Sequence, residues 1–313
     1  NKVEVAGMGG YFSSERILLK PDMQGGFSAN IKDFHWAMHY YFWYVDDVCI
    51  TNPHAAISYG CFAAINTFEV PKEGEDFYFV RDVPHGTVSL CKYTSKVNGH
   101  IKESYVYTPP GYESGDRRYP VLYLQHGVGE NETGWVWQGK MNFIMDNLIA
   151  DKKCVPMIIV ASSGYAFKDN EYPVFFPGDF DSELVNSIIP YIEENFKVKK
   201  GRNNRAVAGL SLGSGQATDI AARHPELFSA VGVFSGVAIH LMKKIIDSPY
   251  RFEAVFMSAG DEEKEILLGI NEMVKEFSRQ GKNSTQKVYE GYHEWHVWRK
   301  SFKDFAQMLF TWD

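Results

Sequence analysis

Gly209-Leu210-Ser211-Leu212-Gly213 is the stretch that decides the fold of this chain. A strand-forming run, 205–208, precedes it, and a helix-forming run, 216–223, follows it. Strand, Gly-x-Ser-x-Gly and helix in this order are the pattern of a nucleophile elbow, in which the serine sits on a sharp turn. Glycines allow that turn where a Cβ would clash. The pattern therefore predicts an exposed Ser211 hydroxyl and a Leu212 amide that points at a bound carbonyl.

Strand and helix signals alternate on both sides of this elbow, from about residue 87 to the end of the chain. Strands are expected over 88–93, 101–107, 120–125, 155–161, 205–208, 230–234, 254–258 and 286–289. Helices are expected over 142–150, 181–196, 216–223, 239–247, 265–280 and 297–309. This alternation predicts the α/β class, with a mostly parallel sheet covered by helices on both faces, as in an α/β-hydrolase fold. The active sites of such sheets lie at the carboxyl ends of the strands, where Ser211 falls.

The front of the chain is expected to be all-β. Its short apolar or aromatic runs are separated by Gly, Pro, Asn and Asp, and lie at 3–5, 17–19, 27–31, 38–44, 49–50, 68–70 and 77–80. Closely spaced strands with turn signals predict a small, Ig-like β-sandwich. The sequence therefore predicts two domains, a sandwich over residues 1–86 and an α/β domain over residues 87–313.

An activated serine needs a base within hydrogen-bond reach and an acid that orients the base. In this fold the chain order is Ser, then Asp or Glu, then His. Of the ten histidines, only His293 and His296 follow the last predicted strand. His293 is the predicted base, and His296, in the first turn of the last helix, is the alternative. The acid belongs to the loop 259–263, where spacing alone does not choose among three consecutive carboxylates.

The oxyanion hole of an acyl-transfer enzyme needs two backbone N–H donors that point at the developing negative charge. One of them is the amide of Leu212. The other is expected from the turn His126-Gly127-Val128-Gly129, which follows the predicted strand 120–125. Glycines in this turn allow the backbone to approach a substrate closely, and Val128 is the predicted second donor.

Composition narrows the classes of function. A net charge of −7 without a long basic run argues against nucleic acid as the partner. No apolar run approaches the roughly 18 residues of a membrane span. The four cysteines lack metal-ligand spacing, so free and mostly buried thiols are expected, with a disulfide only in an exported protein; they are Cys49, Cys61, Cys91 and Cys154. No metal or organic cofactor is expected.

Four motifs together resemble the esterases of carbohydrate esterase family one, which includes feruloyl esterases, acetylxylan esterases and esterase D-like enzymes. They are Tyr119-Pro-Val-Leu-Tyr-Leu-Gln-His-Gly127, Arg205-Ala-Val-Ala-Gly-Leu-Ser-Leu-Gly213, Val233-Phe-Ser-Gly236 and Gly291-Tyr-His-Glu-Trp-His-Val-Trp-Arg299. The front of the chain is similar to the family 48 carbohydrate-binding modules, through 41–47 and 82–86. That similarity implies a module whose first strand is already under way at Asn1.

The resemblance implies Ser211 as nucleophile, His293 as base and, three residues after Gly260, Glu263 as acid. Members of the family usually carry Asp at that position, so Asp261 stays as the alternative. Four aromatic side chains are candidates to line the substrate pocket, with a structural place in the core as the alternative for each: Trp135, Tyr165, Trp295 and Trp298.

The resemblance also implies a function. We expect a secreted or periplasmic bacterial serine esterase that removes feruloyl groups from plant cell-wall arabinoxylan through an acyl-enzyme. The alternatives are an acetylxylan esterase, a siderophore esterase or acyltransferase of the same fold, and a catalytically inactive glycan-binding protein. In the last case the stacking surface would come from the sandwich, with Trp36, Trp43 and Tyr44 as candidates.

Overall fold

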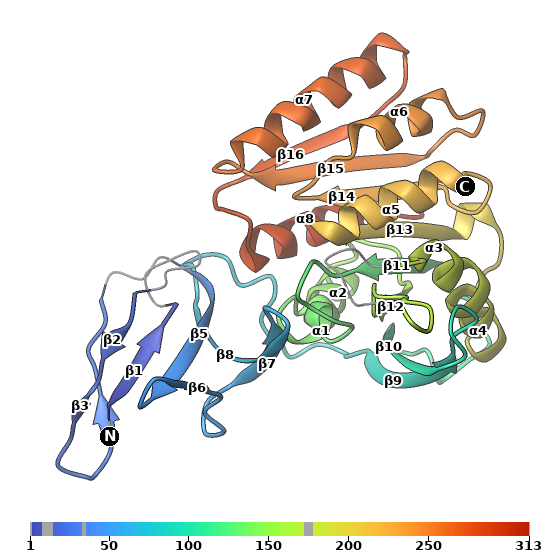
Figure 1. The fold of residues 1–313 in the computed structure, drawn as a ribbon. Helices are drawn as coiled ribbons and strands as arrows, with labels where there is room; N and C mark the ends of the chain where they lie inside the picture. The colour runs from blue at the N-terminus through green and yellow to red at the C-terminus, as the bar shows by residue number, and fades with distance from the viewer. Residues whose placement is uncertain (1, 8–14, 33–35, 172–177, 313) are drawn as a thin grey trace.

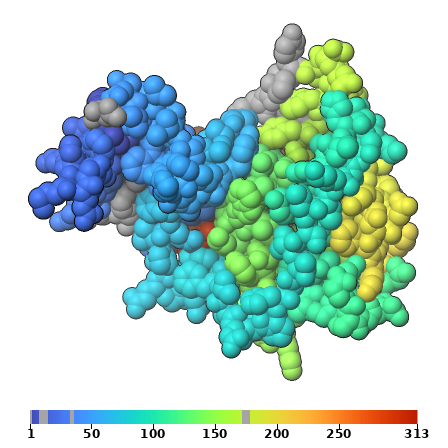
Figure 2. Space-filling model, turned by 90° about the horizontal axis from the view of Figure 1, so that it is seen from below, coloured from blue at the N-terminus to red at the C-terminus, as the bar shows by residue number. Residues whose placement is uncertain are grey.

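The computed structural model describes residues 2–7, 15–32, 36–171 and 178–312. They form a six-stranded front sheet, an eight-stranded sheet and a separate two-stranded ribbon. In Figure 1 the front strands lie to one side of the larger sheet and its helices. Figure 2 shows the same front part, in blue, as a lobe that projects from the larger body.

The front part is all-β, as predicted. Its sheet has the order β2-β1-β5-β8-β7, with β6 paired to β5 and every pair antiparallel. The strands are β1 (Val3–Ala6), β2 (Ile17–Leu18), β5 (Ala37–Val45), β6 (Val48–Ile50), β7 (Ile57–Gly60) and β8 (Ala63–Val70), and the ribbon is β3 (Lys20–Pro21) with β4 (Phe27–Ser28). In β5, Ala37, His39 and Tyr41 are buried in alternation, which is the two-residue period of a strand. The predicted strand 77–80 is wrong, because these residues form a turn that buries Tyr78 in the larger core. Asn1, at which the predicted module was already under way, lies outside the described residues.

The larger sheet has the order β16-β15-β14-β13-β11-β12-β10-β9. Its strands are β9 (Thr87–Thr94), β10 (Ile101–Thr108), β11 (Val121–Gln125), β12 (Ile158–Ser162), β13 (Arg205–Leu210), β14 (Ala230–Phe234), β15 (Ala254–Gly260) and β16 (Thr285–Tyr289). In the order in which they lie in the sheet, the strands β12, β11, β13, β14, β15 and β16 are all parallel. The strand β10 is antiparallel to both of its neighbours, β12 and β9. Every residue of β11, β12, β14 and β15 is buried, as expected for parallel strands with both faces covered.

Helices cover both faces of this sheet, which confirms the predicted α/β-hydrolase architecture. They are α1 (Gly134–Trp137), α2 (Met141–Ala150), α3 (Phe180–Glu183), α4 (Ile189–Asn195), α5 (Leu212–Arg223), α6 (Ile239–Asp247), α7 (Lys264–Arg279) and α8 (Trp295–Met308). One hydrophobic core lies under α3 to α7, and a second lies under α2 and α8. The helix predicted over 181–196 consists of α3, a π-helical segment (Leu184–Ile188) and α4. Among the described residues, every helix is too short or too polar to cross a bilayer.

An ion pair between a buried arginine and a half-buried glutamate joins the front sheet to the larger body. The side chain of Arg299, in α8, is 0% exposed and pairs with Glu69 of β8. The same guanidinium donates to the carbonyl of Gln138 at 2.6 and 2.8 Å, and it lies 4.3 Å from the ring centroid of Tyr78. Since removing one partner of a buried pair is costly, this contact ties the two parts together.

The four cysteines are free thiols, as expected, but they are less buried than the sequence predicted. Cys49 is exposed, and the other three are half-buried.

Candidate active site

Ser211 occupies the sharp turn between β13 and α5. Its backbone has φ 52° and ψ −118°, a conformation that costs a non-glycine residue roughly 1–3 kcal/mol and clusters at functional sites. A Cβ at Gly209 would lie 2.3 Å from the carbonyl oxygen of Gly213, so only glycine lets the helix fold back over the strand. The Ser211 amide donates to the Phe234 carbonyl at 2.9 Å, which fixes the turn against β14. The elbow is therefore held by its neighbours rather than by its own local preference.

The turn after β11 runs beside this elbow. A Cβ built on Gly127 would lie 3.3 Å from the Ser211 Cβ, so the two turns are in contact. Within the described ranges, no hydrogen bond involves the amide of Val128 or that of Leu212. The Leu212 amide is also one of the unpaired donors at the start of α5, where the helix dipole is positive. Two free donors thus lie on the two turns that meet at Ser211.

His126 fixes the turn after β11 to the loop after β12. Its Nε2 accepts a hydrogen bond from the Gly164 amide at 2.9 Å, so the proton of the neutral ring lies on Nδ1. Nδ1 then donates to the Gly127 carbonyl at 2.7 Å. Burial lowers the pKa of His126 to about 4, so this arrangement is kept at neutral pH.

His293 and Glu263 form a close pair. The imidazole Nδ1 lies 2.7 Å from Glu263 Oε1. The other carboxylate oxygen, Oε2, accepts from the Ser235 hydroxyl at 2.7 Å and from the Gly260 amide at 2.6 Å. Because an ionised carboxylate only accepts, Nδ1 carries the proton and Nε2 is left as the acceptor. This is the protonation state that a general base needs.

The alternatives from the sequence lie elsewhere. The Asp261 carboxylate accepts from the Gly291 amide at 2.9 Å, and Glu262 is an exposed side chain. His296 is buried with its Nε2 2.7 Å from a carboxylate oxygen of Glu75. Burial lowers the pKa of His296 to about 3. The structure therefore pairs His293 with Glu263 and with neither of the other two acids.

Neighbouring parallel strands bring these groups to one edge of the sheet. Ser211 follows β13, Ser235 follows β14, Glu263 comes shortly after β15, and His293 comes shortly after β16. The carboxyl ends of these strands meet at the same edge, which is where ligands bind in such sheets. Among the described residues no hydrogen bond joins the Ser211 hydroxyl to His293; such bonds often tighten only when substrate is bound.

Three of the four aromatic side chains considered for the substrate pocket belong to the core. Trp135 is 1% exposed and its indole N–H donates to the Gln125 carbonyl at 2.8 Å. Trp295 is buried against Trp135, with their ring centroids 5.3 Å apart. Trp298 is buried as well, and it stands at right angles to the His293 ring with the centroids 5.0 Å apart. All three indoles are buried in this structure, as the core alternative for them predicted, and a contact of any of them with substrate stays a prediction. Trp298 packs against His293.

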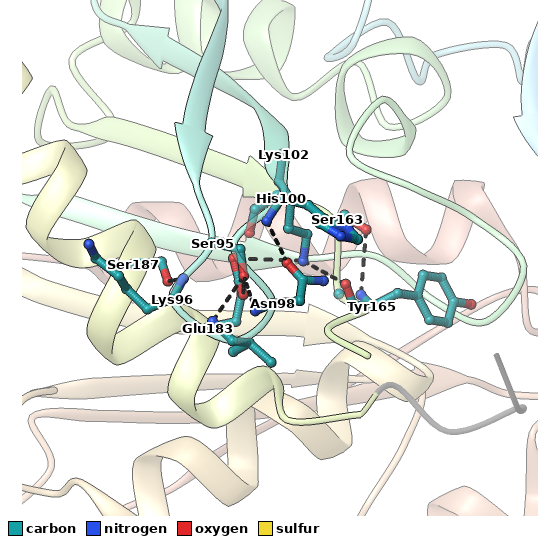
Figure 3. A network of polar contacts seen from close by, with 12 residues as sticks. Ser95, Lys96, Asn98, His100, Lys102, Ser163, Tyr165, Glu183 and Ser187 are labelled. Carbon is teal, nitrogen blue, oxygen red and sulfur yellow. Dashed lines mark hydrogen bonds and ion pairs between the residues drawn. The ribbon is translucent and has the colours of Figure 1, made fainter. Parts of the chain in front are cut away.

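Tyr165 follows β12 in the chain, and its half-buried side chain reaches the turn after β11. Its hydroxyl accepts from the Gly129 amide at 2.9 Å. Figure 3 shows a polar network that holds its backbone, while its ring points away from that network. Lys102 Nζ donates to the Tyr165 carbonyl at 2.6 Å and lies 3.7 Å from the buried carboxylate of Glu183. Tyr165 is thus a fixed aromatic side chain next to the turn 126–129.

The sequence analysis missed Ser235. Its hydroxyl contacts Glu263, and its own backbone has φ 50°, an uncommon value for a side chain other than glycine. Ser235 is part of the motif Val233-Phe-Ser-Gly236. A short motif does not indicate a contact with Glu263, which lies 28 residues further along the chain. No group of three or more His, Cys, Asp or Glu side chains forms a metal site in the part of the chain that the structure describes.

Replacing Ser235 by alanine is expected to lower kcat for ester hydrolysis by about tenfold with little change in KM. A hydrogen bond to a charged group contributes about 1.5–3 kcal/mol, and here it holds the acid that orients His293. Steady-state kinetics on a soluble ester would measure this loss. Ser235→Gly is the matched control, because glycine also lacks the hydroxyl but relieves the positive φ. Both variants should lose activity alike, and wild-type kcat in either would remove Ser235 from the site.

The chain matches the model of the family described as "Putative esterase" over residues 95–309. It is 38% identical over 280 residues to an endo-1,4-beta-xylanase/feruloyl esterase of Xylanibacter ruminicola. That match covers 87% of this chain and 38% of the relative, so the chain spans less than half of the relative's length.

Solved structures share the fold. A ferulic acid esterase of Anaeromyces mucronatus is 22% identical, with a TM-score of 0.67, and the match covers 75% of this chain and 95% of that one. The enterobactin esterase of Shigella flexneri is 14% identical with a TM-score of 0.67, and the match covers 98% of this chain and 88% of that one. The second match reaches the front sheet as well as the larger body.

Proposed function

Because this chain belongs to the esterase family, we propose that it hydrolyses carboxylic esters with Ser211 as the nucleophile. The observation that carries the proposal is the pair of His293 and Glu263 at the same sheet edge as the strained Ser211 turn. A nucleophile next to a base that is itself oriented by an acid is the arrangement of acyl-transfer catalysis.

The reaction follows from the positions of these groups. The Ser211 oxygen attacks the ester carbonyl while His293 Nε2 takes the hydroxyl proton. The amides of Val128 and Leu212 donate to the oxyanion that forms on the carbonyl oxygen. His293 then gives its proton to the leaving alcohol, and an acyl-enzyme remains on Ser211. Water, deprotonated by His293, attacks the acyl-enzyme, and the acid product leaves as Ser211 regains its proton.

We propose feruloyl and related hydroxycinnamoyl esters of arabinoxylan as the substrates. The support is the 38% identical relative, whose name includes feruloyl esterase. Tyr165 is the aromatic side chain that we keep as a substrate contact, because it is half-buried beside the turn 126–129, which we call the oxyanion turn. A polymeric substrate of this kind lies outside the cell, which supports secretion or a periplasmic location.

For the front sheet, which we place in a domain that ends near residue 86, we propose a scaffold role. Two of the aromatic side chains considered for glycan stacking are covered by cations. Lys72 Nζ lies 4.1 Å from the Trp36 ring centroid, and the Arg16 guanidinium lies 3.7 Å from that of Tyr44. The third, Trp43, lines a cavity of about 390 Å³ and is the one of the three that we keep as a candidate for a glycan contact. The ion pair between the buried Arg299 and the half-buried Glu69 supports the scaffold role.

The test of the proposed function is release of ferulic acid from methyl ferulate and from feruloylated arabinoxylan, compared with acetate release from acetylxylan. Turnover of a catecholate siderophore ester is measured in parallel. Release of ferulic acid in preference to the other products is the expected result. Acetate release alone would move the substrate to acetylated xylan, and turnover of the catecholate ester alone would make the protein a siderophore esterase. Absence of turnover of every ester tested would contradict the proposed function and favour a catalytically inactive glycan-binding protein.

A further inference from the structure

A buried carboxyl, that of Glu130, lies between the turn after β11 and the loop that carries His293. Glu130 is 6% exposed. Its Oε1 accepts a hydrogen bond from the Tyr40 hydroxyl at 3.1 Å. The Trp295 indole N–H is shared between this Oε1, at 3.0 Å, and the Tyr40 hydroxyl oxygen, at 2.9 Å. Glu130 follows Val128 by two residues, and Trp295 follows His293 by two. A single carboxyl oxygen of Glu130 therefore links the turn that carries Val128, the proposed oxyanion donor, with the loop that carries His293, the proposed base.

The front sheet closes this cluster from a third side. The Tyr40 hydroxyl, from β5, accepts from Gln138 Nε2 at 3.1 Å. Gln138 Nε2 also donates to the Tyr59 carbonyl of β7 at 2.7 Å. The second oxygen of Glu130 fits against Gly134, where a Cβ would lie 3.0 Å from Oε2. The carboxyl thus sits in a space shaped for it.

We propose that Glu130 is a positioning residue of the esterase reaction, which holds the oxyanion turn and the His293 loop in register. The inference rests on the proposed ester hydrolysis at Ser211. Glu130 does not touch the reacting atoms and acts through Val128 and His293. Because a displacement of about 1 Å can cost roughly 10²-fold in rate, loss of this contact should lower kcat more than it changes KM.

The surroundings of the Glu130 carboxyl favour its protonated, uncharged form. Burial raises the pKa of Glu130 to about 8. Burial also raises the pKa of each titratable side chain that faces it, so these groups are uncharged at neutral pH: Tyr40 in β5, Cys61 in the β7–β8 turn and Tyr165 in the loop after β12. No cation is paired with Glu130 in the described part of the chain, and its Oε2 has no hydrogen-bond partner there. Above pH 8 a carboxylate would therefore form close to the turn that stabilises an oxyanion, and activity should fall.

Glu130→Gln and Glu130→Ala test the proposal with p-nitrophenyl acetate, an activated ester with a good leaving group. Glutamine keeps the acceptor oxygen and resembles the neutral acid, so Glu130→Gln should keep kcat below pH 8 and lack the loss above it. Glu130→Ala should lose at least about tenfold in kcat at all pH values. Tyr40→Phe, which removes one donor, should give a smaller loss in the same direction. Glu194→Gln makes the same change on the exposed face of α4 and should match the wild type.

A thermal measurement without substrate gives an independent result. The folded-state pKa of about 8 lies above the unfolded value of about 4.3, so the folded wild type loses stability relative to the unfolded chain as pH rises between these values. The Tm of Glu130→Gln should therefore rise relative to the wild type over this window.

The outcomes separate the two proposals. A wild type that hydrolyses no ester would overturn the proposed function and this inference with it. An active wild type with an equally active Glu130→Ala variant would overturn only the role of Glu130. Superimposable pH profiles of the wild type and Glu130→Gln, with parallel Tm curves, would likewise overturn it.

Discussion

Replacing Ser211 by alanine is expected to lower kcat on methyl ferulate by about 10⁴-fold or more. The substitution removes the only atom that can form the acyl-enzyme, while the elbow backbone, the oxyanion amides and His293 stay in place. In serine hydrolases the loss of one triad member removes most of the acceleration, because the members act as a unit. Stopped-flow or steady-state release of ferulic acid would measure it.

The matched control is Ser278→Ala, which makes the same change on an exposed face of α7. Its kcat should equal that of the wild type. Equal thermal stability of Ser211→Ala and the wild type would show that the loss comes from chemistry, since alanine keeps the Cβ and leaves the positive φ of the turn unchanged. Residual activity of Ser211→Ala within tenfold of the wild type would rule out Ser211 as nucleophile.

Replacing Glu69 by alanine is expected to lower the free energy of unfolding by about 3 kcal/mol. The change leaves the guanidinium of Arg299 buried and without its anion, and breaking such a pair costs about 3–5 kcal/mol. The lower end applies here, because Arg299 keeps its bonds to the Gln138 carbonyl and the Glu69 side chain is 26% exposed. Urea unfolding followed by tryptophan fluorescence would measure the change.

Glu103→Ala is the matched control for Glu69→Ala. Glu103 also lies on a strand, and its ion pair with Lys92 is exposed, so its loss should cost less than about 1 kcal/mol. A larger effect at Glu69 than at Glu103 supports the front sheet as a scaffold of the larger body. Equal and small effects would show that the front sheet contributes little to its stability.

The sequence predicted the elements that local signals define. Short stretches of sequence define the Gly-x-Ser-x-Gly turn and each strand and helix of the alternating pattern. The candidate nucleophile, acid and base were then found in the segments where this fold places them. The prediction of a strand over 77–80 was wrong because these aromatic residues lie in a turn, where Tyr78 is buried against the guanidinium of Arg299. Composition alone does not distinguish an apolar turn in a core from a strand.

Contacts between distant segments were beyond prediction. Glu130 meets Tyr40 and Trp295 across 90 and 165 residues, and no pattern in one sequence reports such pairings. The same limit explains the buried indoles. Trp135 and Trp298 lie in the expected segments, but which way a ring faces depends on the packing of β11 and α8. Glu263 was identified from the family resemblance, since the loop 259–263 offers three acids and only the fold selects one.

The central claim, that Ser211 is the activated nucleophile, is tested most directly by a fluorophosphonate, which leaves a stable adduct on an activated serine. Peptide mass mapping of the labelled protein would locate the adduct. We predict a single adduct on Ser211, which excess methyl ferulate suppresses and His293→Ala abolishes. An adduct on another serine, or none in a protein that still hydrolyses esters, would contradict this account.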